Sequence, residues 1–338
     1  MKNTYTQAAD FWQERDFGAK ISATFEFIGA HWRLLGKCLL YFTLPFSLVM
    51  GIGLGFFNNS VYNMSGRAVA AQHSGGAFPT ASSPFAMFSF GGLGLAVAGG
   101  VLAFLVLSGT LYGYLRARLR LPATEPVTPT DVWAEMRAKL GRMVLASLLL
   151  AFGGGLGFSI LFGGLVGGIA AVQPGVGATA LAFLLVLIPS IYLSIALSLY
   201  FPVLWLEDLS ILASIGRCFH LIRGQWWATL GLLLIAGFLQ SILSIVFAVP
   251  QYAVMFGKVL QVPGLNSDVL GLITNCLYAT GIIFTYTIPL LALVFQYFNL
   301  TEQKDGFGLR LLVDKLGQSQ GLPVAQSSHY RPDEEGEY

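Results

Sequence analysis

Residues 209–249 read LSILASIGRCFHLIRGQWWATLGLLLIAGFLQSILSIVFAV, and this stretch decides the fold class. Its first half is amphipathic and carries aromatic and basic residues. Its second half, from residue 229 to residue 249, contains no charged residue. A helix of about 20 apolar residues is long enough to cross the hydrocarbon core of a bilayer. The pattern therefore predicts a helix at the membrane interface followed by a membrane-spanning helix.

The same order of residue types occurs three times. The amphipathic segments 17–36, 128–141 and 209–231 each contain Trp and basic residues and close on Leu-Gly. Each is followed by two apolar runs, which gives six predicted spans at 39–57, 90–112, 144–172, 178–204, 229–249 and 270–298. We therefore expect an all-α, polytopic transmembrane bundle of three hairpin units, each preceded by an interfacial amphipathic helix. The units are 17–115, 116–206 and 207–300, between a polar N-terminal tail (1–16) and a C-terminal tail (301–338) that is partly disordered and acidic at its end.

Composition supports a membrane protein and excludes several other classes. Hydrophobic residues make up 55% of the chain and charged residues 11%, more apolar surface than a soluble fold of this size can enclose. The net charge of +2 gives no strong field that would attract nucleic acid. Cys38, Cys218 and Cys276 are far apart and lack metal-ligand spacing. The sequence therefore predicts no disulfide framework, no metal site and no cofactor.

The distribution of basic residues predicts the orientation. Of the 19 Lys and Arg residues, all except Arg67 and Lys258 lie in the N-terminal region, the two basic linkers or the C-terminal tail. Loops rich in Lys and Arg stay in the cytoplasm. Both termini are therefore predicted to be cytoplasmic, in a bacterial inner membrane.

The predicted spans carry no ionisable residue at mid-bilayer depth. Proton relays, voltage sensors and coupled pumps need such residues. The main polar side chains that remain are Gln240, Asn275 and Gln296. They could line a path for a solute, or they could form hydrogen bonds between helices, and the second interpretation is the more common one.

Glycine and proline predict details of packing. Glycines cluster in the spans, and the run from Gly153 to Gly168 in the third span favours close helix contacts. We therefore expect the third span at the centre of the bundle, with a pore lining as the alternative. Pro189 and Pro289 occupy similar places in the fourth and sixth spans and are predicted to kink them. The matched positions support the repeat.

The amphipathic segments contain the candidate contacts with lipids or a protein partner. These are the basic and aromatic side chains Arg217, Arg223, Trp226, Trp227, Trp32 and Arg33. They could bind anionic headgroups, or they could only anchor the helices at headgroup depth, which is the simpler interpretation. Glu207 and Asp208 are expected to pair with Arg217 or Arg223. The acidic end of the tail is either a solvated segment or a contact for a basic partner.

Residues 215–227 (IGRCFHLIRGQWW) with the following Leu230-Gly231 resemble a signature of bacterial multi-helix membrane proteins. These proteins are related to the membrane domain found beside some glycerophosphodiester phosphodiesterases. The opening Arg15-Asp16-Phe17-Gly18 and the acidic tail ending in Tyr look like the stand-alone members of Bacteroidetes-type bacteria. The resemblance implies a membrane topology and transfers no catalytic residue. The phosphodiesterase barrel with its metal site has no counterpart in this sequence.

The sequence thus favours a non-enzymatic scaffold or accessory subunit that organises lipids or partner proteins at the cytoplasmic face. A passive channel or transporter for a small or amphipathic solute is the alternative, with Gln240, Asn275 and Gln296 as its lining. An enzyme acting on lipid headgroups comes third, because no nucleophile beside a base and no metal set is visible.

Overall fold

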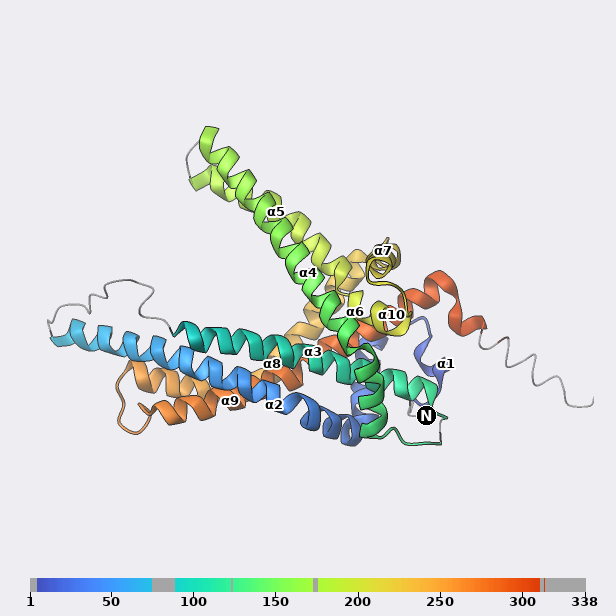
Figure 1. Ribbon diagram of the computed structural model, residues 1–338, viewed down its shortest axis with the longest axis horizontal. Coiled ribbons are helices and arrows are strands. Elements are labelled where there is room, and N and C mark those ends of the chain that lie inside the picture. Colours follow the sequence, from blue (N-terminus) through green and yellow to red (C-terminus); the bar gives the residue numbers. More distant parts are fainter. Residues whose placement is uncertain (1–4, 75–88, 123, 173–175, 311–312, 314–338) are drawn as a thin grey trace, which may run out of the picture.

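The computed structural model describes residues 5–74, 89–122, 124–172, 176–310 and 313 (Figure 1). Within these residues the secondary structure is helical, which confirms the predicted all-α class. The helices are α1 (Ala8–Phe11), α2 (Phe17–Ser74), α3 (Phe90–Arg120), α4 (Pro129–Val172), α5 (Val176–Leu197), α6 (Tyr200–Leu206), α7 (Ile211–Ile222), α8 (Trp226–Val259), α9 (Asp268–Thr285) and α10 (Thr287–Asp305). The described part of the chain holds six helical stretches long and apolar enough to span a membrane, as in an integral multi-pass membrane protein.

The amphipathic segments are built in two ways. In the first and second units they are the beginning of a long helix, because α2 and α4 run without interruption from the segment into the span. In the third unit, α7 is a separate helix that ends before α8 begins. Gly224 lies between the two with a φ of +85°, a left-handed conformation that glycine adopts without strain. A separate interfacial helix, expected in every unit, is therefore present only in the third.

The centre of the bundle is formed by α10, where every residue from Thr287 to Thr301 is buried. The prediction that the third span is central is wrong. Figure 1 shows α4 and α5 diverging from the other long helices as a hairpin. A methyl group added to any glycine from Gly153 to Gly168 would meet no atom within 4 Å. Hydropathy places a helix in the membrane, but it does not specify which faces of which helices meet.

Close glycine contacts occur instead between α2 and its neighbours α3 and α9. A Cβ atom on Gly53 would lie 2.2 Å from the backbone nitrogen of Ala96 in α3. A Cβ atom on Gly51 would lie 2.5 Å from Cα of Cys276 in α9. Small residues let helix backbones approach when lipid supplies no hydrophobic driving force for association. Packing through glycine is thus confirmed for the first span.

The N-terminal segment is part of the fold from residue 5 onward, contrary to the predicted polar tail. Tyr5 and Phe11 are buried, with ring centroids 5.5 Å and 6.4 Å from that of Phe295 in α10. The backbone nitrogen of Arg15 donates to Oδ1 of Asn299 at 2.7 Å. A few aromatic anchors in a polar segment are enough to dock it on an apolar groove. At the other terminus, the acidic end of the predicted tail lies outside the described residues.

The two prolines that match in sequence differ in structure. The sixth predicted span is divided at Tyr286, which ends α9 and precedes α10, and Pro289 is the third residue of α10. There its missing N–H costs nothing, because the first turn of a helix has no internal acceptors. By contrast, α5 continues through Pro189 to Leu197, and the fourth predicted span is divided at Ser198-Leu199 before α6 begins.

Candidate functional site

The basic residues gather at one end of the molecule, which we call the basic end. It contains α1, the beginning of α2, the end of α3 and α7 (Figure 1). Its cations come from elements far apart in the sequence and include Arg116, Arg118, Arg120, Lys139, Arg142 and Arg217. The opposite end holds the buried Lys258, whose ammonium group donates to Oδ1 of Asn59 at 2.9 Å and pairs with Asp268.

Asp208 joins two helices at the basic end. Arg116 of α3 donates to both of its carboxylate oxygens, at 3.1 Å and 2.8 Å, and Lys139 of α4 pairs with it as well. Both cations also donate to the carbonyl of Trp205, at 2.6 Å and 2.8 Å. The Arg116 guanidinium, followed by Lys139, holds the pKa of the Asp208 carboxyl well below its usual range. This contact fixes the loop after α6 against α3 and α4.

Arg217 forms a second paired group at the same end. Its Nε atom donates to Oε2 of Glu207 at 2.8 Å, and its Nη2 atom pairs with Asp305 at the end of α10. The Tyr297 hydroxyl donates to Oε1 of Glu207 at 3.0 Å. The expected pairing of Glu207 with Arg217 is thus present, whereas Asp208 pairs with other cations. Arg217 is engaged in holding α7 to α10 and has little capacity left for a ligand.

The other candidate contacts are more accessible. Arg223 is exposed at the end of α7, and its carbonyl accepts a hydrogen bond from Lys304 at 3.2 Å. Trp226 stacks on Tyr192 with a centroid distance of 5.7 Å. Trp227 is 78% exposed and Trp32 is 61% exposed, with the guanidinium of Arg33 5.6 Å from the Trp32 ring.

One exposed tryptophan is found in the amphipathic segment of each unit. Trp32 belongs to the first, Trp133, 46% exposed, to the second, and Trp227 to the third. Tryptophan is enriched at membrane–water interfaces, because its ring is apolar and its N–H needs a polar partner. Each unit therefore has one exposed side chain of the type that is common at membrane–water interfaces.

The polar residues inside the spans form hydrogen bonds between helices. Gln240 donates to Ser244 at 3.0 Å and to Thr285 of α9 at 3.4 Å. Oδ1 of Asn275 accepts from Asn58 at 2.7 Å and from Gln251 at 3.2 Å.

Gln296 also forms a hydrogen bond between helices, since its Nε2 atom donates to Thr229 of α8 at 2.9 Å. Its Oε1 atom is buried and has no partner among the described residues. All three side chains are buried; Gln240 and Gln296 each join two helices, and Asn275 joins α9 to both α2 and α8. This arrangement is the one expected of interhelical contacts, and a continuous solute path does not follow from it.

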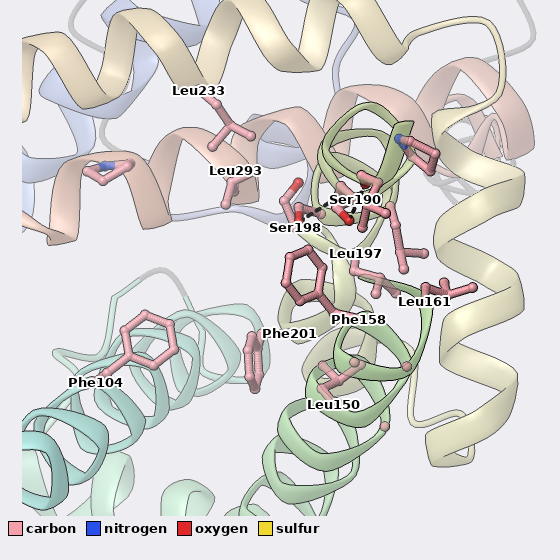
Figure 2. Close-up of a pocket in the computed structure, with 18 of the residues that line it drawn as sticks. Phe104, Leu150, Phe158, Leu161, Ser190, Leu197, Ser198, Phe201, Leu233 and Leu293 are labelled. Carbon is pink, nitrogen blue, oxygen red and sulfur yellow. Dashed lines mark hydrogen bonds between the residues drawn. The ribbon is translucent and has the colours of Figure 1, made fainter. Parts of the chain in front are cut away.

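A large apolar cavity lies where the α4–α5 hairpin diverges from the bundle (Figure 2). Its volume is about 930 Å³, and its walls include Phe104, Leu150, Phe158, Phe201 and Leu293. The serine hydroxyls in its wall, at 190, 194 and 198, donate to carbonyls of their own helix. The wall is mainly apolar, and its other hydroxyls are those of Tyr112 and Tyr286. None of Gln240, Asn275 and Gln296 lines this cavity.

Two features of the site have no counterpart in the sequence predictions. The network of Arg116, Glu135, Lys139 and Asp208 joins two units, and its members are too far apart in the sequence for a spacing rule to connect them. Arg142 lies at the start of the third apolar run and carries a buried guanidinium nitrogen that has no hydrogen-bond partner among the described residues. In the sequence, its position directly before a long uncharged run was the one feature that could have identified Arg142 as a candidate site residue.

Comparisons of the chain with protein-family models, with curated proteins and with solved structures found no match.

Proposed function

We propose that this membrane protein is a non-enzymatic scaffold or accessory subunit that organises lipids or partner proteins at the cytoplasmic face of a bacterial inner membrane. The observation that carries the proposal is the construction of the basic end. Charge pairs fix α3, α4, α7 and α10 to one another, while each unit presents one exposed tryptophan. Such a rigid, basic and aromatic surface suits contact with headgroups and with proteins bound there.

The chemistry of the acids supports a structural role. Asp208 is held by Arg116 and Lys139, and a carboxylate with a lowered pKa is a weak general base at neutral pH. Glu207 receives hydrogen bonds from Arg217 and Tyr297. We also propose that the protein is related to the membrane domains found beside some phosphodiesterases. Those membrane domains carry no catalytic residue.

The test is gentle affinity purification from native membranes, followed by mass spectrometry. The protein is purified with and without residues 318–338, and as the exposed-tryptophan variant Trp32→Ala/Trp227→Ala. A protein partner in stoichiometric amount that is lost with the tail or with the tryptophans supports the scaffold. Phe256→Ala, 58% exposed on α8 near Lys258 at the opposite end, is the matched control for loss of an exposed aromatic ring away from the basic end. Purification of the protein without any partner in all forms contradicts the scaffold.

A second candidate function rests on the cavity of Figure 2. Its apolar wall favours an apolar or amphipathic solute over a hydrophilic one. Gly157 lines the cavity, and a Cβ atom added there meets no atom within 4 Å, so a larger side chain has room to begin. Gly157→Trp should therefore fill the cavity and reduce binding of an apolar fluorescent probe. Gly155→Trp, on the same helix but outside the lining, is the matched control. Equal binding by both variants contradicts this candidate.

A further inference from the structure

A second cavity lies at the basic end between α4 and the beginning of α7. Its volume is about 490 Å³, and it is lined by Arg142, Leu149, Ser210, Ile211 and Leu212. Its lining therefore consists of one cation, one serine and three aliphatic side chains. This combination suits a molecule with a charged group at one end and an apolar remainder.

Arg142 differs from the other cations around it. Arg116, Lys139 and Arg217 each pair with a carboxylate. Nη2 of Arg142 is buried without a hydrogen-bond partner, and no carboxylate in the described part of the chain pairs with this guanidinium. An arginine that only snorkels would keep its head group in water. A partly buried guanidinium without a carboxylate partner is costly, and an anion in the cavity beside it would compensate its charge.

The surroundings add positive potential. Arg116, Arg120, Lys139 and Arg142 gather here, and Glu135 and Asp208 are the carboxylates that pair with them. When Arg217, Glu207 and Asp305 of the neighbouring paired group are included, an excess of one positive charge remains.

The first turn of α7 also adds positive potential to the cavity. Ser210 caps it by accepting from the Ala213 nitrogen at 3.2 Å, and the N–H groups of Ile211 and Leu212 have no acceptor within the helix. The beginning of a helix favours an anion. A phosphate in this cavity would meet both the guanidinium and the helix dipole.

Membrane depth decides the source of the phosphate. Residues 143–172, directly after Arg142, contain no charged residue, so Arg142 lies at the boundary between headgroups and hydrocarbon. Further along the same side of α4 lie exposed apolar side chains at helical spacing, namely Leu145, Leu149, Phe152 and Leu156. An acyl chain attached to a phosphate at Arg142 could lie along this stripe, whereas a free phosphate would leave it uncovered.

We propose that Arg142, together with the first turn of α7, binds the phosphate of an anionic phospholipid whose acyl chain lies on the outer face of α4. The proposal deepens the proposed function and rests on it, because it names the lipid class that the basic end holds. A zwitterionic lipid would bring its own cation into a region that already has an excess of positive charge. The anionic class is therefore the one that fits.

The test uses the full-length protein in detergent, titrated with phosphatidylglycerol or phosphatidylcholine, with bound lipids counted by native mass spectrometry. Arg142→Gln should lower the affinity for phosphatidylglycerol by about tenfold, the effect of losing a charge-assisted hydrogen bond. It should leave the weaker binding of phosphatidylcholine unchanged. Arg142→Lys should restore most of the affinity, which a merely misfolded variant could not do. Arg67→Gln, which removes one exposed cation beside Lys258 at the opposite end of the molecule, is the matched control and should bind as the wild type does.

Equal binding of phosphatidylglycerol by the wild type and Arg142→Gln would overturn the proposal. Equal affinity of the wild type for the two lipids would do so as well. Inorganic phosphate is the third probe, and full displacement of the lipid by millimolar phosphate would assign the cavity to a free anion instead. These outcomes are independent of the partner purification. A lost partner with retained lipid, or the reverse, therefore shows which proposal has failed.

Discussion

The span formed by α9 and α10 and the span formed by α4 are alike in hydropathy and differ in packing. Their most apolar stretches have mean hydropathies of 1.8 and 2.1, yet 61% of residues are buried in the first and 6% in the second. In α10 the side chains include Phe295, Tyr297 and Phe298, which fill the centre of the bundle. In α4 a Cβ atom added to any glycine from 153 to 168 would meet no atom of another helix within 4 Å. Membrane insertion and central packing are therefore separate properties of a helix.

The first prediction sharpens this comparison most. Phe298 is fully buried, with its ring centroid 5.4 Å from that of Phe11 and 4.8 Å from that of Trp12. Phe298→Ala should destabilise the fold by about 3–5 kcal/mol, because it leaves a cavity at the centre. Ile160 on α4 is 71% exposed, and Ile160→Ala should cost less than about 0.5 kcal/mol. Unfolding in detergent, followed by circular dichroism, measures both. Equal losses would show that the hairpin is packed in solution.

The second prediction compares two glycines. Gly53→Ala places a Cβ atom 2.2 Å from the backbone of α3 and should cost about 1–3 kcal/mol through overpacking. Gly155→Ala meets no neighbour and should stabilise α4 by about 0.5–1 kcal/mol, since alanine is the better helix former. The two substitutions should change the stability in opposite directions, and thermal unfolding in the same detergent measures both changes. Destabilisation by both substitutions would indicate that a partner packs on α4.

The third prediction concerns the basic end. Asp208→Asn removes the ion pairs with Arg116 and Lys139, and should cost about 1 kcal/mol, because the carboxylate is 56% exposed and screened by solvent. The folded pKa of Asp208 is lowered, so its stabilisation is complete above the unfolded pKa of about 3.9 and is lost as the pH falls toward the folded value.

The measurement compares the unfolding temperatures of the wild type and Asp208→Asn over a range of pH. The gap between the unfolding temperatures of wild type and Asp208→Asn should be constant from pH 5 to 8. It should shrink below about pH 4, where the unfolded carboxyl takes up its proton. A gap that widens in acid would mean that Asp208 is not the anion that holds α3 and α4 together.

The smallest effect is expected for the polar residues inside the spans. Gln240→Leu removes its bonds to Ser244 and Thr285, but these two hydroxyls, 2.8 Å apart, keep each other as partners. The cost should be about 0.6 kcal/mol, the average for such bonds in membrane proteins. Reconstituted in liposomes, this variant and the wild type should show the same solute permeation. A change in permeation with unchanged stability would favour the channel over the scaffold.

Individual residues show how much of the fold and of the candidate site could be predicted from the sequence. The spans follow from length and hydropathy, and the partnership of Glu207 with Arg217 follows from their charge and proximity in the sequence. The partnership of Asp208 with Arg116 does not, because it joins the loop after α6 to helix α3, 92 residues away in the sequence. The burial of Tyr5 and Phe11 was also unpredictable, since a short polar segment with three aromatic residues has the composition of a tail, and its contacts with α10 join residues almost 290 positions apart.

By itself, the sequence determined that the protein is helical, membrane-spanning and built from six apolar runs with amphipathic segments. These properties depend on the solvent that each segment requires, and composition encodes that requirement locally. Only the tertiary structure decided that α10 is central, that the α4–α5 hairpin stands apart, and that Arg142 is left without a partner beside a cavity. Those facts depend on how side-chain shapes from distant helices meet, because within lipid every apolar face satisfies the same hydropathy and shape alone selects its neighbour.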